Sequence, residues 1–464
     1  MGEKEASCRD ESVIIDIPEE LEPDLNSTCW IHRVPRKLRQ IHEAGYTPQL
    51  ISVGPFHYDK PNLKAMEHHK TKYHRQFWNR DFCKHVGEDD IRDFIRKGDR
   101  RQRIWCCYAS AFELRNNPDH FFHVVLRDTC FIFELFLRNF ELSKCNDYML
   151  RTPWLRKAIE LDLIMLENQL PYFVFTELFD FILQKQPEDR VNLDIPPYLS
   201  KQQKESERHD FFIKITCEFF GDYYRYSKAL DKKMQNKPLD KEMQRFKKIK
   251  HFTDLVRQFL CPNRSYPLDA GNISCLYTAK QLDRAGVSFV PCKNQRLADI
   301  HRKKGTCKFT CISWKSLKLE VPELKVEDDT ECLMRNVMAL EQCLYPLETY
   351  ICNYISFLDQ LINTAEDVEL LVEKKVVHNL LGSNDAVADL VNKLCDQIVE
   401  TSFYYTSICE DLNEHCNSFW NTTKATLKSV YFKDLWTGSS SVVAFFVLVF
   451  SIVSVAASVK DLFF

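Results

Sequence analysis

The chain has 464 residues, of which 45% are hydrophobic and 28% are charged, a composition typical of a folded globular protein. Its 63 basic and 66 acidic residues give a net charge of −3, so no overall electrostatic attraction favours nucleic acid or anionic lipid. Only 11 glycines are present, and the glycine-rich phosphate-binding motifs and the G-x-S-x-G motif of hydrolases are absent. The 19 cysteines are scattered without a C-x-x-C pair, which predicts mostly buried, reduced thiols rather than a disulfide scaffold.

The two ends of the chain differ sharply in polarity. Residues 1–28 are charged and lack the apolar core of a signal peptide, so we interpret them as a mobile tail. Residues 436–460 contain 18 consecutive uncharged positions, Val442–Val459, and predict a transmembrane helix; the alternative is a buried core helix. Residues 461–464 form a short tail.

This C-terminal segment predicts a single-pass membrane protein that contacts the membrane through Val442–Val459. Without an N-terminal signal, the large N-terminal domain is expected in the cytosol, and the sequence does not identify the membrane. Four N-x-[ST] sequons argue the other way, because glycosylation requires a lumenal or extracellular side: Asn26, Asn263, Asn272 and Asn421.

Residues 29–435 predict one large, mainly helical domain. Residues 287–326 alternate between apolar and polar positions, which predicts a small β insert. Residues 184–208 and 231–250 are polar and predict loops or insertions. The second of these is basic, so contact with anionic lipid head groups is the alternative to a solvated insertion.

The stretch Gly54–His74 contains four histidines, which raises the question of a metal or catalytic centre. Adjacent His68 and His69 diverge by about 100° around a helix, whereas zinc sites on one helix use i, i+4 pairs. His57 lies in the preceding loop. Spacing therefore favours helix surface and loop anchoring over a metal site.

The same helix carries a charged pair on its predicted interior face. Lys70 falls on the stripe formed by Leu63, Met66 and Tyr73, and Glu67 precedes it by one helical turn. We therefore expect a Glu67–Lys70 ion pair on the interior side, which specifies packing more than it stabilises.

Three further groups of polar residues are candidate sites, and the first two are a Cys/His group and an Asn-Gln pair. Cys292, His301, Cys307 and Cys311 match no standard zinc spacing. Asn168 and Gln169 interrupt an apolar run before Pro171 and are expected to satisfy backbone groups that the proline leaves unpaired.

Asp128 and Glu134 are six residues apart in an apolar helix, a spacing that makes a poor acid–base pair. No catalytic residue, cofactor, metal or nucleic acid is predicted.

Several blocks of the sequence resemble the plant proteins grouped as domain of unknown function 247, the UPF0481-type proteins. They are "CWIHRVPRKLRQ…YTPQLISVGPFHYDKPNLKAMEHHK", "RDTCFIFELF", "LIMLENQLPYFV", "TAKQLDRAGVSF", "LEVPELKVEDDTECLMRNVMALEQC" and "YISFLDQLINTAEDVELLVEKKVVHNLLG". The resemblance implies a plant membrane-associated protein without an established enzymatic activity. Some grass relatives are linked to self-incompatibility, which implies recognition between proteins.

The resemblance also marks positions that belong to family motifs and are expected to be structural. They are Gly54, Pro55, His57, Glu67, His69, Lys70, Asp128, Glu134, Glu167, Asn168, Gln169 and Pro171. Our main hypothesis is a membrane-anchored interaction or recognition module with an unknown protein partner. The alternative is a membrane-tethered enzyme with an unrecognised centre around His57, Glu67 and His69.

Overall fold

The structure is a computed structural model, and it is mainly helical, as expected. It describes residues 29–96, 99–109, 113–141, 146–185, 205–221, 223, 245–262, 271, 275–292, 295–309, 312–400, 402–418, 443–444 and 446–455. The predicted tails at residues 1–28 and 461–464, the four sequons and most of the predicted loops at 184–208 and 231–250 lie outside the described residues.

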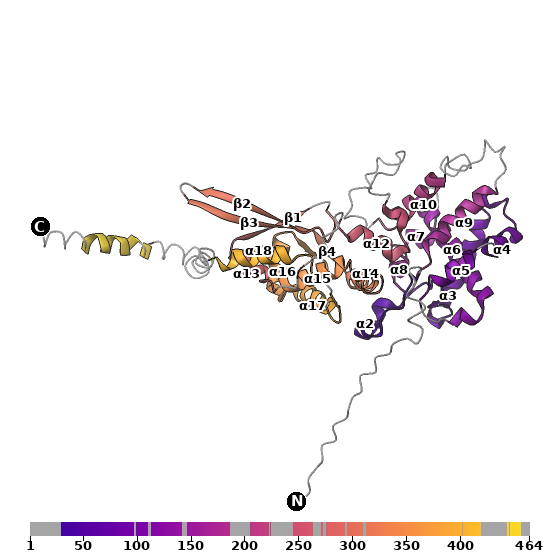
Figure 1. Ribbon diagram of the computed structural model, residues 1–464, viewed down its shortest axis with the longest axis horizontal. Coiled ribbons are helices and arrows are strands. Elements are labelled where there is room, and N and C mark those ends of the chain that lie inside the picture. Colours follow the sequence, from indigo (N-terminus) through magenta and orange to yellow (C-terminus); the bar gives the residue numbers. More distant parts are fainter. Residues whose placement is uncertain are drawn as a thin grey trace, which may run out of the picture.

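Helices account for the first part of the body. In chain order they are α2 (Arg36–Ile41), α3 (Lys64–Trp78), α4 (Glu88–Arg96), α5 (Arg100–Cys106), α6 (Pro118–Phe140), α7 (Tyr148–Arg151), α8 (Pro153–Ile164), α9 (Tyr172–Gln184), α10 (Glu205–Phe219) and α12 (Phe252–Leu260). Short 3-10 turns lie among them: η1 (Glu43–Tyr46), η2 (Pro61–Leu63), η3 (Asp81–Cys83), η4 (Glu113–Asn116) and η8 (Arg245–Lys248). Helices α3 to α10 gather at one end of an elongated body (Figure 1).

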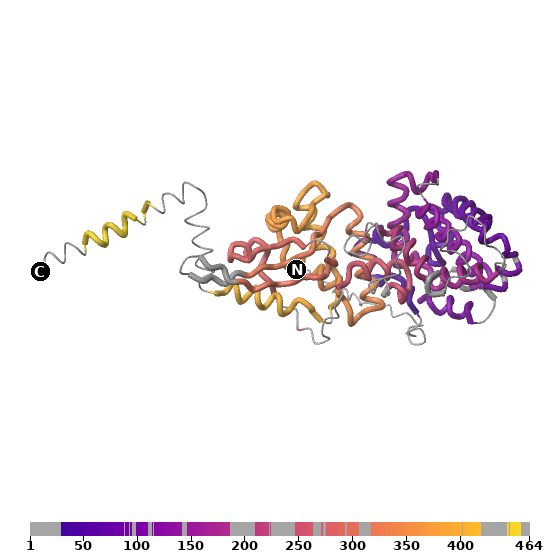
Figure 2. The backbone as a smooth tube through the Cα atoms, turned by 90° about the horizontal axis from the view of Figure 1, so that it is seen from above, coloured from indigo at the N-terminus to yellow at the C-terminus, as the bar shows by residue number. Residues whose placement is uncertain are grey.

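The second part of the body combines helices with short strands. In chain order these are α13 (Ala279–Arg284), β1 (Val287–Cys292), β2 (His301–Phe309), β3 (Ile312–Pro322), β4 (Leu324–Val326), α14 (Thr330–Leu344), α15 (Tyr350–Leu361), α16 (Ala365–Glu373), β5 (Val377–Asn379), α17 (Asn384–Leu394) and α18 (Thr406–Asn417). Two perpendicular views place the sheet and most of these helices opposite α3–α10, with α12 and α14 between the two ends (Figures 1 and 2).

The predicted β insert at 287–326 is confirmed as a three-stranded mixed sheet in the order β1-β3-β2. Strand β1 runs parallel to β3, and β2 pairs with β3 in antiparallel fashion. Val287 and Phe289 of β1 and Leu317 and Leu319 of β3 are buried, while the intervening Ser288 is exposed. The sheet therefore buries one face, as alternation predicts.

Helix α6 lies at the centre of the core at the α3–α10 end. It begins at Pro118 behind Asn117, whose side chain accepts a hydrogen bond from the His120 amide, a favourable start for a helix. Phe133 packs 4.7 Å, ring to ring, from Phe212 of α10. One cluster of buried apolar side chains continues from this region to Leu412 in α18.

The junction between the two ends is held by buried ionic and aromatic contacts. Arg257 of α12 donates to Glu341 Oε1 of α14 at 3.0 Å, and its guanidinium lies 4.0 Å from the Tyr345 ring. Glu341 Oε2 accepts hydrogen bonds from the amides of Ile351 and Cys352, each at 2.9 Å. This carboxylate therefore ties α12, α14 and the start of α15 together.

His251 joins the start of α12 to the first described residues. Its Nδ1 caps the helix by accepting from the Asp254 amide at 3.4 Å, and its Nε2 lies 3.2 Å from the Trp30 carbonyl oxygen. Both contacts require a neutral ring that carries its proton on Nε2. The fully buried imidazole thus links the chain entry to the junction.

The predicted transmembrane helix at 436–460 is wrong for the described part of the chain, where no helix is long and apolar enough to cross a membrane. Membrane contact through Val442–Val459 and a cytosolic body stay predictions.

We expect His251 to make folding stability depend on pH. Burial lowers the pKa of His251 from 6.5 to about 4, so the unfolded chain takes up a proton first as the pH falls. The contribution of neutral His251 to the free energy of unfolding is therefore complete above pH 6.5 and falls below that pH, by about 2 kcal/mol at pH 5.

Urea unfolding of wild type and His251→Gln at pH 7 and pH 5 measures this contribution. The drop in unfolding free energy between these pH values should be about 2 kcal/mol smaller in the variant. His68→Gln, at an exposed position on α3, is the matched control and should keep the wild-type drop. An unchanged drop in His251→Gln would contradict the assignment.

Candidate functional site

The segment Gln49–Gly54 crosses the α3–α10 end without belonging to a helix or strand. It follows Pro48 and leads into the Gly54-Pro55 turn, and residues 51–54 are buried. Buried backbone amides and carbonyls that lack a helical or sheet partner must be satisfied in another way. Here side chains from three distant helices and one turn provide the partners.

Asp162, in the last turn of α8, binds the first three amides of the segment. Its Oδ1 accepts from Gln49 at 2.9 Å, and its Oδ2 accepts from Leu50 and Ile51, each at 2.7 Å. Burial raises the pKa of this carboxyl to about 6, although the three amides favour the charged form.

Asn168 continues the row of contacts from the turn after α8. Its Oδ1 accepts from the Val53 amide at 2.6 Å, and its Nδ2 donates to the carbonyls of Ile51 and Asp162 at 3.0 and 2.8 Å. Because the amide group supplies both a donor and an acceptor, one side chain bonds the segment and the end of α8 together.

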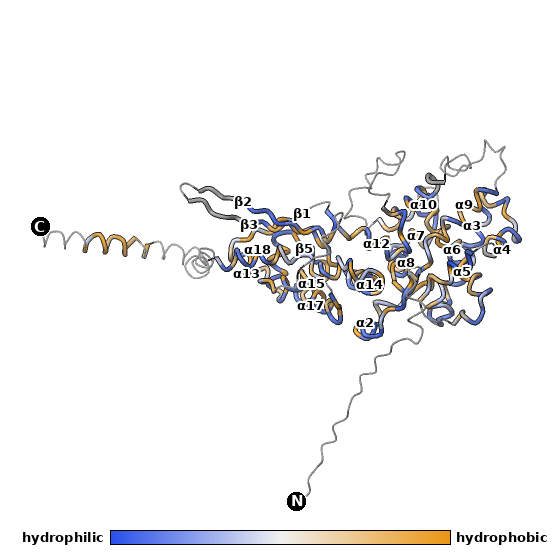
Figure 3. Tube along the Cα trace, in the orientation of Figure 1, coloured by the Kyte–Doolittle hydropathy of each residue, from blue (hydrophilic) through white to orange (hydrophobic). Residues whose placement is uncertain are grey.

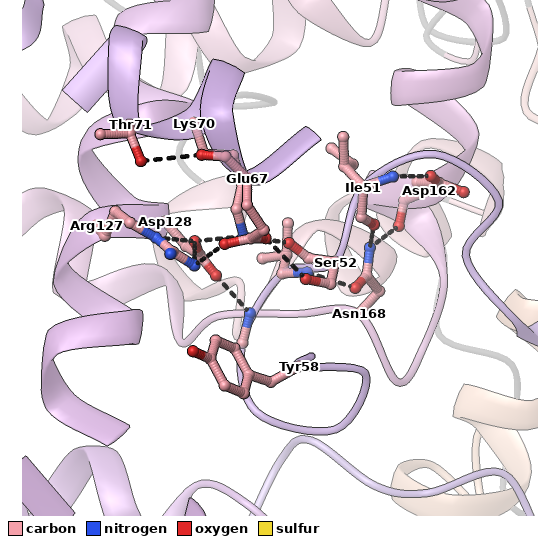
Figure 4. A network of polar contacts seen from close by, with 12 residues as sticks. Ile51, Ser52, Tyr58, Glu67, Lys70, Thr71, Arg127, Asp128, Asp162 and Asn168 are labelled. Carbon is pink, nitrogen blue, oxygen red and sulfur yellow. Dashed lines mark hydrogen bonds and ion pairs between the residues drawn. The ribbon is translucent and has the colours of Figure 1, made fainter. Parts of the chain in front are cut away.

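Lys70 of α3 lies at the centre of the site and is fully buried (Figure 4). Its Nζ is 2.7 Å from Glu67 Oε1, 2.7 Å from Asp128 Oδ1 of α6, and 2.8 Å from the Ser52 carbonyl oxygen. The second oxygen of Asp128 accepts from the Gly54 amide at 3.1 Å. All three donors of the ammonium group therefore have acceptors.

Arg127 completes a cluster of two cations and two carboxylates. Its Nη2 is 2.6 Å from Glu67 Oε2 and 3.3 Å from Asp128 Oδ1. The expected Glu67–Lys70 pair is present and extends into a neutral four-membered network. Such an arrangement offsets the desolvation of each charge and holds backbone in place, and it presents no unbalanced charge to a substrate.

His57 and Glu167 form a second buried pair beside the Gly54-Pro55 turn. His57 Nε2 is 3.1 Å from Glu167 Oε2, without the alignment of a hydrogen bond. Glu167 also accepts from the Val34 amide at 2.7 Å and pairs with Arg39. Burial lowers the pKa of His57, which Glu167 opposes. For Glu167 burial acts to raise the pKa, but His57 and Arg39 lower it to about 2.

Gln169 satisfies backbone groups at the end of α8 and at the start of α12. Its Nε2 donates to the carbonyls of Leu163 and Met165 at 2.6 and 2.8 Å, at the end of α8, and its Oε1 accepts from the Phe252 amide at 2.9 Å. Pro171 then precedes α9 as its N-cap residue.

Gly54 passes so close to this turn that a side chain would not fit. Its φ is +71°, and a Cβ built on it would lie 2.6 Å from the Gln169 carbonyl oxygen. The Tyr108 hydroxyl donates to that same oxygen at 3.1 Å. Glycine is therefore required for both conformation and space.

Glu134 takes part in a different network from Asp128, although both lie on α6. Arg80 donates to Glu134 Oε2 at 2.5 Å, and Arg138 donates to Glu134 Oε1 at 2.7 Å. Arg138 also bonds Asp147, which accepts from the Tyr73 hydroxyl at 2.6 Å. The two acids are structural in separate places.

The structure does not gather the histidines of the opening stretch into a metal site. His68 and His69 are exposed, and His74 Nε2 accepts from Trp78 Nε1 at 3.1 Å. Across the described residues, no group of three or more His, Cys, Asp or Glu side chains is placed to hold a metal ion. In the group Cys292, His301, Cys307 and Cys311, the last residue lies outside the described residues.

Sequence reasoning missed three charged residues of the site, Asp162, Arg127 and Arg39. Arg127 is adjacent to Asp128 and Asp162 follows Glu160 by two residues, so neither stands out as a lone charge. Both lie beside apolar helix positions, where a charged side chain indicates a buried partner. No comparable signal marks Arg39, which lies in a run of basic residues.

Comparison with known proteins shows what the chain is similar to. Residues 31–450 match a family described as a plant protein of unknown function, DUF247. A UPF0481 protein of Arabidopsis thaliana is 28% identical over 92% of this chain and 86% of its own length. A putative UPF0481 protein of the same plant is 22% identical over 91% and 90%. No solved structure matches the chain.

Replacing Lys70 should destabilise the fold strongly. In Lys70→Met the fully buried carboxylate of Asp128 loses the nearer of its two cations, which lies at 2.7 Å against 3.3 Å for Arg127, so we expect a loss of about 3–5 kcal/mol. Lys64→Met is the control, because Lys64 pairs with Asp59 on the exposed surface and should contribute less than about 1 kcal/mol. Urea unfolding distinguishes the two, and equal effects would refute the central role of Lys70.

Gly54→Ala tests the close approach of the turn. We expect a loss of more than about 2 kcal/mol, because the new methyl group meets a carbonyl oxygen and the backbone is left-handed. Gly382→Ala is matched, since Gly382 also has a positive φ of 91° but has no atom within 4 Å of the added Cβ. It should lose only about 1 kcal/mol. Thermal unfolding that ranks the variants in the opposite order would contradict the steric argument.

Proposed function

The chain belongs to the plant family DUF247, whose function is unknown, and on that premise we propose that it is a protein-recognition module. In this proposal the helical body is a rigid scaffold, and exposed apolar side chains bind a protein partner. The proposal follows from how the buried charges are used and from which apolar side chains are left on the surface.

The buried ionic groups of the candidate site support a scaffold role. Lys70, Glu67, Asp128 and Asp162 each bind an opposite charge or a backbone amide within 3.1 Å. A general acid or base must instead be able to reach a substrate proton. These side chains hold the segment Gln49–Gly54 in position.

The alternative enzyme centre gains no support from the placement of its residues. His57 lies beside Glu167, Glu67 binds Lys70 and Arg127, and His69 is exposed on α3. The three side chains thus have different surroundings.

The observation that carries the proposal is the exposed apolar run at 443–455. Every described residue in it is exposed, and the larger side chains are Val443, Phe446, Val447, Leu448, Val449, Phe450, Ile452, Val453 and Val455. Figure 3 shows the hydrophobic colour along this helix. Large exposed apolar surfaces mark interaction sites, and a helix apolar on all sides needs a covering surface.

Two exposed aromatic side chains on α7 and α8 offer a second, separate contact surface on the body (Figure 1). Tyr148 of α7 is 73% exposed and Trp154 of α8 is 66% exposed. Tyrosine and tryptophan are enriched among residues that dominate binding energy at protein interfaces. Asp147, which precedes Tyr148, is held by Arg138 and Tyr73, so the position of α7 is fixed.

Quantitative affinity purification of the full chain from plant tissue tests the proposal. Phe446 and Phe450 lie one turn apart on the helix, and Phe446→Glu/Phe450→Glu places two charges where an apolar partner would bind. At least one protein that wild type enriches should fall about tenfold or more in this variant.

The matched control is Phe446→Leu/Phe450→Leu, which keeps the helix apolar. It should retain the partner within about twofold. The proposal fails if the charged variant enriches the same proteins as wild type, or if wild type enriches none.

A further inference from the structure

Residues 1–28 carry a charge opposite to that of the rest of the chain. Nine acidic and two basic residues give this segment a net charge of −7, so the remaining residues carry +4 of the chain's −3. Four of the acids lie within ten residues of Cys29: Glu19, Glu20, Glu22 and Asp24. A separation of charge this strong favours contact between the segment and a basic surface of the body.

Backbone hydrogen bonds define where the chain enters the body. The amides of Trp30 and Ile31 donate to the Cys107 carbonyl at 2.9 and 2.8 Å, and the Ala109 amide donates to the Ile31 carbonyl at 2.9 Å. The bridge between Ile31 and Tyr108 is parallel. In a parallel bridge the two segments run in the same direction, so the residues that precede each partner lie at the same end of the bridge. Upstream of Cys107 lies α5.

Helix α5 presents arginines that are held in place by aromatic rings. The guanidinium groups of Arg100, Arg101 and Arg103 lie 4.1, 4.4 and 4.3 Å from the ring centres of Phe94, Phe122 and Phe173. Stacking orders these side chains before any partner binds, which reduces the entropy lost on binding.

These arginines adjoin the entry point of the chain. The Phe173 ring that Arg103 covers also makes an edge contact with Trp30, at 6.2 Å between centres. On another side, Lys250 Nζ is 5.9 Å from the centre of the Trp30 ring. Cations therefore flank Trp30, one residue after the first described residue, Cys29.

Two acids among the described residues pair with these arginines. Glu177 pairs with Arg100 and Arg103, and Asp119 pairs with Arg101. In these described pairs, three guanidinium groups share two carboxylates. Each guanidinium has five N–H donors, so it can bind a further carboxylate while it keeps its present one.

We propose that residues 1–28 dock in cis on the arginine-bearing surface of α5, through Glu19, Glu20, Glu22 and Asp24. Asp24 and Glu19 precede Cys29 by five and ten residues, which span up to about 17 and 34 Å. Helix α5 is about 10 Å long, so the whole helix is within reach. Because the segment is covalently attached, its effective concentration is in the millimolar range, and weak ionic contacts suffice. This inference is independent of the apolar helix at 443–455.

Photo-cross-linking in the full chain tests the docking. p-Benzoylphenylalanine replaces Leu21, which lies among the four acids, and mass spectrometry locates the attachment sites after irradiation. Cross-links should map to α5 or to residues around Lys250. Their yield should fall at least about fivefold in Glu19→Lys/Glu20→Lys/Glu22→Lys/Asp24→Lys, and also at 1 M salt, because exposed ion pairs are screened there.

A matched variant reverses the same number of charges farther from the entry point. Glu3→Lys/Glu5→Lys/Asp10→Lys/Glu11→Lys should change the yield less than about twofold, since those acids are not the proposed contacts. All substitutions lie in residues 1–28, so the body keeps its own sequence.

Three results would overturn the proposal. The first is cross-links that map mainly to other elements or do not form. The second is an equal effect of the two charge-reversal variants. The third is a cross-link between isotope-labelled and unlabelled chains in a mixture, which would place the segment on a second copy.

Discussion

The buried cluster formed by Lys70, Glu67, Asp128 and Arg127 is the constraint on which the α3–α10 end of the molecule depends. It joins α3 to α6 and binds the backbone at both Ser52 and Gly54. Separating Lys70 from Asp128, which are both fully buried, would leave an uncompensated charge in a region of low dielectric, which is more costly than the gain from pairing. The cluster therefore acts as a unit and fixes the position of the backbone between α2 and α3.

The same principle extends from this cluster to the junction with the second part of the body. Asn336 of α14 accepts from the Leu166 amide at 2.9 Å and donates to the Gly45 carbonyl at 2.7 Å. Glu341 binds Arg257 and two amides at the start of α15. Polar side chains thus satisfy irregular backbone at each place where distant segments meet. Because these polar side chains are bonded to backbone, they fit the proposed scaffold role, in which other surfaces bind the partner.

The recognition proposed for the exposed apolar run at 443–455 and the proposed docking of the acidic segment on α5 would draw on different forces. The first depends on burial of apolar area and is insensitive to salt, whereas the second depends on ionic contacts that salt screens. Arg103 and Trp30 connect the second surface to the chain entry, and His251 connects Trp30 to α12. A chain of direct contacts therefore connects the entry of the chain at Trp30 to the junction of the two parts of the body.

Local patterns in the sequence determined the helical class, the β insert at 287–326 and the interior position of Lys70, because these follow from periodicity within one element. They did not determine that Lys70 reaches Asp128, that Asp162 binds three amides from a segment more than 100 residues away, or that β4 pairs with β5. Such contacts join residues distant in sequence, so only the tertiary structure decided them. The composition of residues 436–460 predicted a membrane span, whereas no helix of the described residues is long and apolar enough to cross a membrane.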